Sequence, residues 1–278
     1  MSAHHIFNFL NKSRSPKHKL RDAVKSNDID SLNELLMQGV DPNMKIEKSG
    51  GNRPIHIAAT FGYYRIIELL INAGATCNLP NGNGVTALYN AVRFGHPRAL
   101  QTIFRHSPQI LGLDQLWFEG GFVHALLRCK CGPIVSTLLI ASPNLRMSRS
   151  NLWRNMLDVC VNRVPDITSI QLLFLTGYRN SDKEFVSFEI EIMKTLQTLE
   201  NEFHCWETSE RYEDDAVQVL RQAVDFITDF KRNPQFLKHH CRLTIRSSFY
   251  NKCNVYYGVE QLPLPKDLKN YLVFHGKL

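Results

Sequence analysis

The residues of this chain whose side chains could take part in chemistry are few and scattered. Cys129 and Cys131 stand two positions apart with His124 nearby, and thiolate and imidazole are the ligands that zinc prefers. A structural zinc site needs a second ligand pair at comparable spacing, and none stands near these residues. Both cysteines fall at the end of an expected helix, where thiols of the core or surface are the simpler interpretation. We therefore expect no metal site.

The other candidate motifs also have structural explanations. The Asn81–Gly84 segment is rich in glycine, but it lies between two similar segments and is typical of a turn and not of a phosphate-binding loop. His239 and His240 fall on the polar side of an expected helix, where solvation is the default. The spacing of the residues indicates no catalytic set of serine, histidine and aspartate, and none of cysteine and histidine. We expect a non-catalytic protein without a cofactor.

Composition favours a globular chain. The 278 residues are 44% apolar and 10% aromatic, and the seven cysteines suit a reducing compartment. No apolar run is long enough to span a bilayer, and residues 1–10 lack the layout of a signal peptide, so we expect a cytoplasmic or nuclear protein without membrane contact. The net charge of +7 includes a basic patch at residues 12–21. Without a recognition helix or stacking aromatics beside it, this patch indicates solvation or partner steering and no specific nucleic-acid binding.

The chain contains a sequence repeat, and the helices of this repeat must position any functional residue. Ile55 and Leu88 occupy equivalent places, as do Gly62 and Gly95, and both pairs are 33 positions apart. A period near 33 with two short helices per unit is the ankyrin signature, and the chain resembles that family from Lys17 onward.

Local residue choices agree with such units. Pro54 suits a first helical position, Thr86 can cap its own helix, and Gly62 and Gly95 allow tight reversals between paired helices. In ankyrin units the place of His56 usually hydrogen-bonds a neighbouring loop, so we expect a structural histidine.

Beyond Phe104 the pattern weakens. Segments 120–127 with 135–139, and 152–159 with 167–175, are interpreted as two degenerate units, which gives about five in all. Two longer helices are expected next, over 185–203 and over 212–230, and together they form a helical bracket. The predicted all-α organisation is a flexible basic arm at 1–16, an ankyrin-repeat solenoid at 17–180, the bracket at 181–233 and a C-terminal segment at 234–278.

Two short apolar patterns mark the C-terminal segment. Leu237, Cys241 and Ile245 are spaced i, i+4, i+8 and would share one stripe of a helix. The strip Leu262–Pro265 must be extended because of its two prolines, and Asp267 can open a last short helix. That helix would carry Leu268, Tyr271 and Leu272.

This arrangement resembles a SOCS box of the three-helix type. In that family the first pattern docks Elongin C, which implies Leu237, Cys241 and Ile245 as contacts here, although Phe236 stands where the family usually has a small residue or proline. The second pattern contacts a cullin scaffold, which implies the cullin-binding residues Leu262, Pro263, Leu264, Pro265, Leu268, Tyr271 and Leu272.

The resemblance to the ankyrin-repeat and SOCS-box family implies a substrate receptor of a multi-subunit cullin-RING ubiquitin ligase. Its expected partners are Elongin C with Elongin B, a cullin-five-type scaffold with a RING subunit, and a target protein that is ubiquitinated and degraded. We expect the target to contact exposed residues of the repeats, among them Tyr63, Tyr64, Arg93 and Phe94. Two alternatives stay open, a non-catalytic ankyrin scaffold without ligase recruitment and a protein that uses its +7 charge on nucleic acid.

Overall fold

The computed structural model describes residues 15–47, 49–107, 129, 131–142, 166–177, 190, 193–194, 197, 212–232, 237–249 and 252–274. These residues form helices and turns with no strand among them, which confirms the all-α prediction for the part of the chain they cover. The chain divides into two compact parts, Met1–Ser107 and Pro108–Leu278, and each is described by itself.

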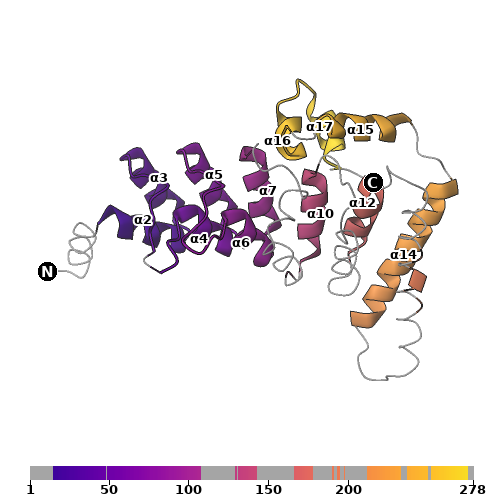
Figure 1. Ribbon diagram of the computed structural model, residues 1–278, viewed down its shortest axis with the longest axis horizontal. Helices are drawn as coiled ribbons and strands as arrows, with labels where there is room; N and C mark the ends of the chain where they lie inside the picture. Colours follow the sequence, from indigo (N-terminus) through magenta and orange to yellow (C-terminus); the bar gives the residue numbers. More distant parts are fainter. Residues whose placement is uncertain are drawn as a thin grey trace. The chain divides into compact units, whose positions relative to one another are not determined.

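The first part is a row of paired helices (Figure 1). The inner helix α4 packs against α2 and α6, and the outer helix α5 packs against α3 and α7. This stacking of equivalent helices confirms three ankyrin units. The helices are α2 (Pro16–Lys25), α3 (Ile29–Met37), α4 (Pro54–Phe61), α5 (Tyr64–Asn72), α6 (Ala87–Arg93) and α7 (Pro97–His106).

Short polar residues and glycine set the ends of these helices. The Thr86 hydroxyl accepts a hydrogen bond from Tyr89 N at 3.3 Å, and Pro54 is the first residue of α4, as predicted. Gly62 ends α4 with φ of 75°, a left-handed conformation that a side chain would strain. A Cβ on Gly62 would also lie 2.6 Å from the ring of His96, so the paired helices can turn this closely only around glycine.

Buried alanines let the inner helices approach one another. Ala58, Ala59 and Ala91 are fully buried, so the helices α4 and α6 meet with little side-chain bulk between them. The rest of this core is aliphatic, and its fully buried members include Leu20, Val24, Leu32, Ile66, Ile67, Leu70, Leu100 and Ile103.

His56 ties neighbouring units together. Its Nε2 lies 3.0 Å from the carbonyl oxygen of Val85 in the next loop, and its Nδ1 lies 3.4 Å from the backbone N–H of Arg53. The ring is fully buried, and burial lowers its pKa, so the neutral tautomer with the proton on Nε2 satisfies both bonds. The structural role expected of His56 is confirmed.

In the second part three helices pack in sequence: α10 (Gly132–Ala141), α12 (Ile167–Gly177) and α14 (Tyr212–Arg232). Helix α12 contacts both α10 and α14. The expected helices around Val135, around Ile170 and over the second half of the bracket are therefore present. The expected helices at 120–127 and 152–159 lie outside the described residues, and only a few positions of 185–203 are described.

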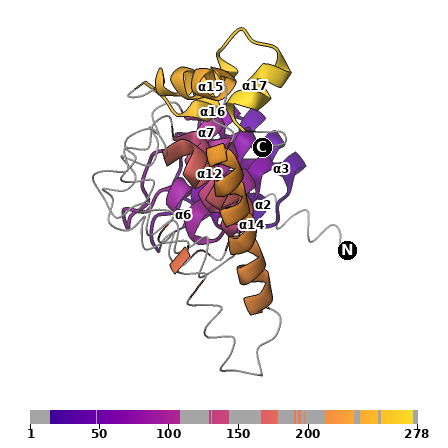
Figure 2. The same cartoon turned by 90° about the vertical axis from the view of Figure 1, so that its right-hand side faces the viewer.

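Three short helices complete the second part: α15 (Leu237–Ser247), α16 (Val255–Glu260) and α17 (Lys266–Leu272). Both views show them grouped together (Figures 1 and 2), and α17 contacts both of the others, while α16 also contacts α10. A three-helix box follows the bracket, as predicted. None of the described helices is long and apolar enough to cross a membrane.

Candidate functional site

Helix α15 presents one apolar edge to solvent. Cys241 is exposed and Ile245 keeps 38% of its surface accessible, although both are residues that usually lie inside. The helix begins at Leu237, the first position of the same stripe, whose side chain lies outside the described part of the chain. Two members of the predicted docking stripe are thus available to a partner.

The opposite edge of α15 is held inside by an arginine. Arg246 is only 1% exposed, and its Nη1 donates to the carbonyl oxygen of Leu272 at 2.9 Å. Its Nη2 lies 3.0–3.2 Å from the carbonyl oxygens of Leu139, Ile140 and Ser142. The two nitrogens therefore connect the last turn of α10 and the end of α17 to α15.

No acidic side chain is recorded beside the Arg246 guanidinium among the described residues. Burial lowers its pKa to about 9, which still leaves the group charged at neutral pH. The charge is instead compensated by carbonyl oxygens at the C-terminal end of α10, where the helix dipole is negative. The ring of Phe274, whose centroid lies 4.8 Å from the guanidinium carbon, adds a cation–π contact.

Arg242, one turn earlier, covers an aromatic ring of α17 and another in the turn after it. Its guanidinium carbon lies 3.6 Å from the ring centroid of Tyr271 and 4.3 Å from that of Phe274. Burial lowers the pKa of Arg242, and Tyr271 opposes that shift. The polar side expected of α15 is therefore in part an inner side, because two of its arginines pack on α17 and the turn after it.

Helix α16 is largely buried within the box. Asn254 is buried and caps the helix by accepting a hydrogen bond from Tyr257 N at 3.0 Å. Gly258 faces the ring of Phe249, since a Cβ there would lie 2.6 Å from a ring carbon. These residues were not predicted as functional from the sequence, where their signal is an asparagine before a short apolar run.

The second pattern divides into exposed and buried residues. Residues 263–265 have no regular structure, and the carbonyl of Pro265 accepts the first backbone hydrogen bonds of α17. The Leu264 N–H also donates to the Leu262 carbonyl at 2.8 Å, so the strip is non-helical, as predicted, but it makes a tight turn around Pro263 and is not fully extended. Pro263 and Pro265 are exposed, and Leu268 is 49% exposed. Leu262, Leu264 and Tyr271 are half-buried, whereas Leu272 is 3% exposed and supports the box from inside.

On the repeats, the predicted target-binding residues lie at helix ends, Tyr63 and Tyr64 at the start of α5 and Arg93 and Phe94 at the end of α6. Tyr64 has the guanidinium carbons of Arg65 and Arg98 at 5.9 Å and 5.8 Å from its ring centroid. The ring of Tyr63 stacks on that of Phe61, with centroids 5.5 Å apart. The two ankyrin units are joined because His96 Nε2 lies 2.9 Å from the Thr60 carbonyl oxygen.

The remaining predicted pair lies at the end of α6. The Arg93 guanidinium is 5.4 Å from the ring centroid of Phe94, which is 48% exposed. Exposed aromatic rings and arginines are the side chains most enriched where proteins bind one another. We call this set the aromatic–arginine surface, and it comprises Phe61, Tyr63, Tyr64, Arg65, Arg93, Phe94 and Arg98.

The two cysteines of the zinc hypothesis lie just before α10. Cys129 is buried and Cys131 is the N-cap residue of the helix, and the Cys129 thiol lies 3.9 Å from the Cys131 carbonyl oxygen. Within the described ranges, no three histidine, cysteine or acidic side chains gather in a way that could hold a metal ion. His124 lies outside the described residues.

Comparison with protein families finds one matching family model in each of the two parts of the chain. Residues 20–111 match the family model of ankyrin repeats in three copies, and residues 233–272 match that of the SOCS box. The first match covers α2 to α7, and the second covers α15 to α17. The docking stripe, the buried Arg246 and the proline strip therefore all belong to the SOCS box.

Curated proteins match half of the chain or less. The chain is 28% identical over 146 residues to the probable E3 ubiquitin-protein ligase XBOS32 of Oryza sativa subsp. japonica, which covers 50% of this chain and 27% of that protein. It is 39% identical over 67 residues to the E3 ubiquitin-protein ligase XBAT33 of Arabidopsis thaliana, covering 24% and 13%. It is 36% identical over 84 residues to human M-phase phosphoprotein 8, covering 30% and 10%.

These relatives differ in their names, and the chain spans about a quarter of the length of the first and about a tenth of the other two. Their activities do not transfer by similarity alone, so the family rests on the two models. With ankyrin repeats in its first part and a SOCS box formed by its last three helices, the chain matches an ankyrin-repeat and SOCS-box protein family.

Proposed function

We propose that this protein is a non-catalytic substrate receptor of a cullin-RING ubiquitin ligase. The observation that carries the proposal is the division of α15 into a buried arginine edge and an exposed apolar edge. A helix that exposes Cys241 and Ile245 while it buries Arg246 is fixed in the orientation that offers its stripe to a partner. Two relatives named E3 ubiquitin-protein ligases agree with a role in this pathway.

Elongin C, bound to Elongin B, would take the exposed stripe. Leu237 would fill a pocket of the partner, and burying a leucine side chain contributes about 1.5–3 kcal/mol. Cys241 and Ile245 would pack beside it as smaller apolar contacts. Losing the binding free energy of the buried Leu237 side chain would be enough to make this residue a hot spot of the interface.

The cullin-five-type scaffold would contact the edge formed by Pro263, Pro265 and Leu268. These are the residues of the second pattern that the box leaves most exposed. Leu262, Leu264 and Tyr271 would contribute their accessible atoms, and Leu272 would act by holding α17 in place. A RING subunit on the scaffold would bring the charged ubiquitin-conjugating enzyme.

The repeats would bind the target through the aromatic–arginine surface, with Tyr63, Tyr64, Arg93 and Phe94 as contacts. Holding the target and the conjugating enzyme on one scaffold raises the effective concentration of the target lysines. Acceleration by proximity needs no catalytic group on this chain. We place this assembly in the cytoplasm, where the ligase components would meet the receptor.

The direct test is capture of purified Elongin B and Elongin C by the full chain. We expect Leu237→Ala with Cys241→Ala to abolish capture while the circular dichroism spectrum and melting temperature stay unchanged. Thr244→Ala, an exposed change on the same helix, is the matched control and should bind as the unmodified chain does. Undiminished capture by the folded double variant would show that the stripe is not the docking site.

A second experiment separates the two patterns. Leu262→Ala with Pro263→Ala should leave Elongin capture intact and weaken recruitment of the cullin by the preformed receptor–Elongin complex. If the cullin were recruited equally well, the assignment of the proline strip would be wrong. If neither Elongin nor a cullin bound the unmodified chain, a plain ankyrin scaffold would be the better description.

A further inference from the structure

A basic pocket lies at the first ankyrin unit, apart from the aromatic–arginine surface. It is an open pocket of about 490 Å³ between α2 and the loop that follows α3, a size within the usual range for ligand pockets. Ile46, which is 2% exposed, supplies an apolar wall. The complete lining is Lys17, His18, Arg21, Lys25, Ile46, Glu47 and Ser49.

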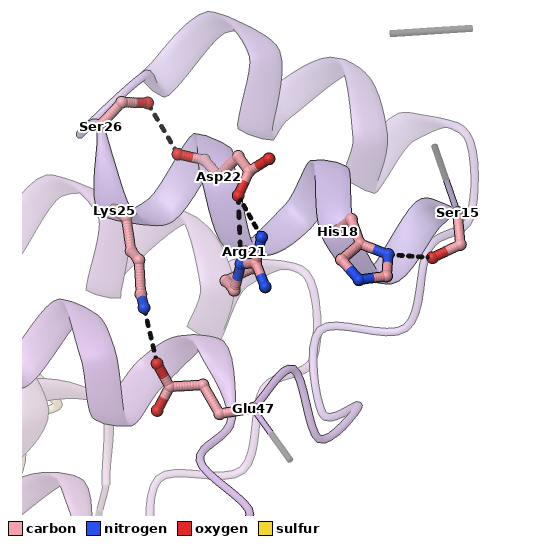
Figure 3. Close-up of polar contacts among 7 residues, drawn as sticks. All are labelled: Ser15, His18, Arg21, Asp22, Lys25, Ser26 and Glu47. Atoms are coloured by element: carbon pink, nitrogen blue, oxygen red, sulfur yellow. Dashed lines mark hydrogen bonds and ion pairs between the residues drawn. The ribbon is translucent and has the colours of Figure 1, made fainter. Parts of the chain in front are cut away.

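The charge of the pocket is positive. Lys17, Arg21 and Lys25 contribute three positive charges, and Glu47 contributes one negative charge (3 − 1 = +2). The Lys25 ammonium lies 2.8 Å from Glu47 and lowers the pKa of that carboxyl, so Glu47 stays ionised and already paired. Figure 3 shows this pair crossing from α2 to the loop.

Lys17 and Arg21, the other two cations of the lining, can still bind a ligand. Arg21 donates its Nε and Nη2 to one oxygen of Asp22, which is not part of the pocket wall (Figure 3). Among the described residues, Lys17 has no acidic partner. A negatively charged ligand would therefore meet Lys17 directly, and it would compete with the Asp22 carboxylate for Arg21, whose Nη1 is not used in that pair.

The spacing of the cations indicates the form of the ligand. Lys17, Arg21 and Lys25 stand four positions apart along α2, and an α-helix rises about 6 Å over four residues. Alternate side chains of an extended peptide are about 6.6 Å apart on one face. The row of cations therefore matches acidic residues at every second position of an extended segment, while the residues between them point away.

The chain's own N-terminal arm does not have this chemistry. Residues 1–14 contain Lys12 and Arg14 and no aspartate or glutamate, so they would be repelled by the pocket. Nucleic acid fits less well than peptide, because Glu47 lies in the wall and the lining contains no phenylalanine, tyrosine or tryptophan ring for base stacking.

We propose that the pocket along α2 binds an extended acidic segment of the target protein, with carboxylates at alternating positions facing Lys17 and Arg21. This inference rests on the proposed receptor function and specifies the class of target segment that the first ankyrin unit recognises. The aromatic–arginine surface would contact another region of the same target.

The test uses the full chain and fluorescein-labelled peptides in fluorescence anisotropy. A peptide with the core Glu-Thr-Glu-Thr-Glu should bind several-fold more tightly than its Gln-Thr-Gln-Thr-Gln counterpart, by up to about 25-fold, since each of the two exposed ion pairs contributes up to a factor of about five. Raising the salt concentration from 50 to 300 mM, roughly halving the Debye length, should weaken the glutamate peptide selectively.

Paired variants locate the binding. Lys17→Gln with Arg21→Gln should remove the preference for glutamate, whereas Lys19→Gln with Arg105→Gln, which removes the same charge outside the lining, should keep it. Equal binding of both peptides, or an equal loss in both double variants, would overturn the proposal. Tighter binding of a single-stranded RNA that depends on the same two cations would overturn it in favour of nucleic acid.

Elongin capture, measured on the same samples, keeps the two proposals separate. The Lys17 and Arg21 variant should capture Elongin normally, because the SOCS box lies in the other compact part of the chain. Peptide binding without Elongin capture would refute the receptor function and leave the pocket assignment standing. Elongin capture without a preference for glutamate would refute the pocket assignment alone.

Discussion

Replacing the buried Arg246 by methionine should release the SOCS box from the helix on which it packs. Methionine has a similar length but no donor, so four carbonyl oxygens lose a charged partner. Hydrogen bonds to charged groups contribute about 1.5–3 kcal/mol each, and one N–H of Nη1 with the two of Nη2 gives a gross loss of about 4.5–9 kcal/mol. Dehydrating the buried cation costs several kcal/mol and offsets much of this sum.

We therefore expect Arg246→Met to lower the stability of the second part of the chain by about 3 kcal/mol, within the range of about 3–5 kcal/mol for breaking a buried charge arrangement. At about 2–4 °C per kcal/mol for a part of this size, its melting temperature should fall by about 6–12 °C. Arg246→Lys should recover part of the loss, because one ammonium can reach only some of the carbonyls.

Calorimetry gives the melting temperature, and hydrogen–deuterium exchange shows where the structure loosens. Faster exchange should appear in α16, in α17 and in the last turn of α10. Lys252→Met, an exposed change in the same box, should leave both measurements unchanged. A melting temperature of Arg246→Met within 1 °C of the unmodified chain, with unchanged exchange in α17, would refute the idea that this arginine holds the box.

Three further predictions concern the repeats and the thiols. Because burial lowers the pKa of His56, the unfolded chain takes up this proton first, so the stability of the repeats should fall as pH drops below about 6.5; His56→Gln should flatten that dependence in urea titrations. Gly62→Ala should cost at least about 1 kcal/mol in the same titrations, through its positive φ and its contact with His96. The Cys129 thiol lowers the pKa of Cys131 to about 7, whereas hydrogen bonding and burial raise that of Cys129, so iodoacetamide labelling followed by peptide mass spectrometry should modify Cys131 with a midpoint near pH 7 and spare Cys129.

Much of the fold followed from short-range patterns. The 33-residue spacing of Ile55 and Leu88 placed the paired helices, because each unit must bury the same apolar positions against its neighbours. Thr86 and Pro54 set helix starts through local hydrogen bonding and a fixed φ. The prolines of the Leu262–Pro265 strip likewise excluded a helix from the segment before α17. Helix caps, turns and periodicity act within a few residues, and they are readable without tertiary contacts.

The sequence by itself determined the stripe on α15 and the strip before α17, the two patterns that identify the SOCS box. Only the tertiary structure decided which edge of α15 faces inward. An arginine at position 246 looks like a surface residue, and its burial depends on carbonyl oxygens of α10 that lie more than a hundred positions earlier. The pocket along α2 depends in the same way on Ile46 and Glu47 folding back beside that helix. Contacts between distant segments follow from packing geometry, which spacing along the chain does not specify.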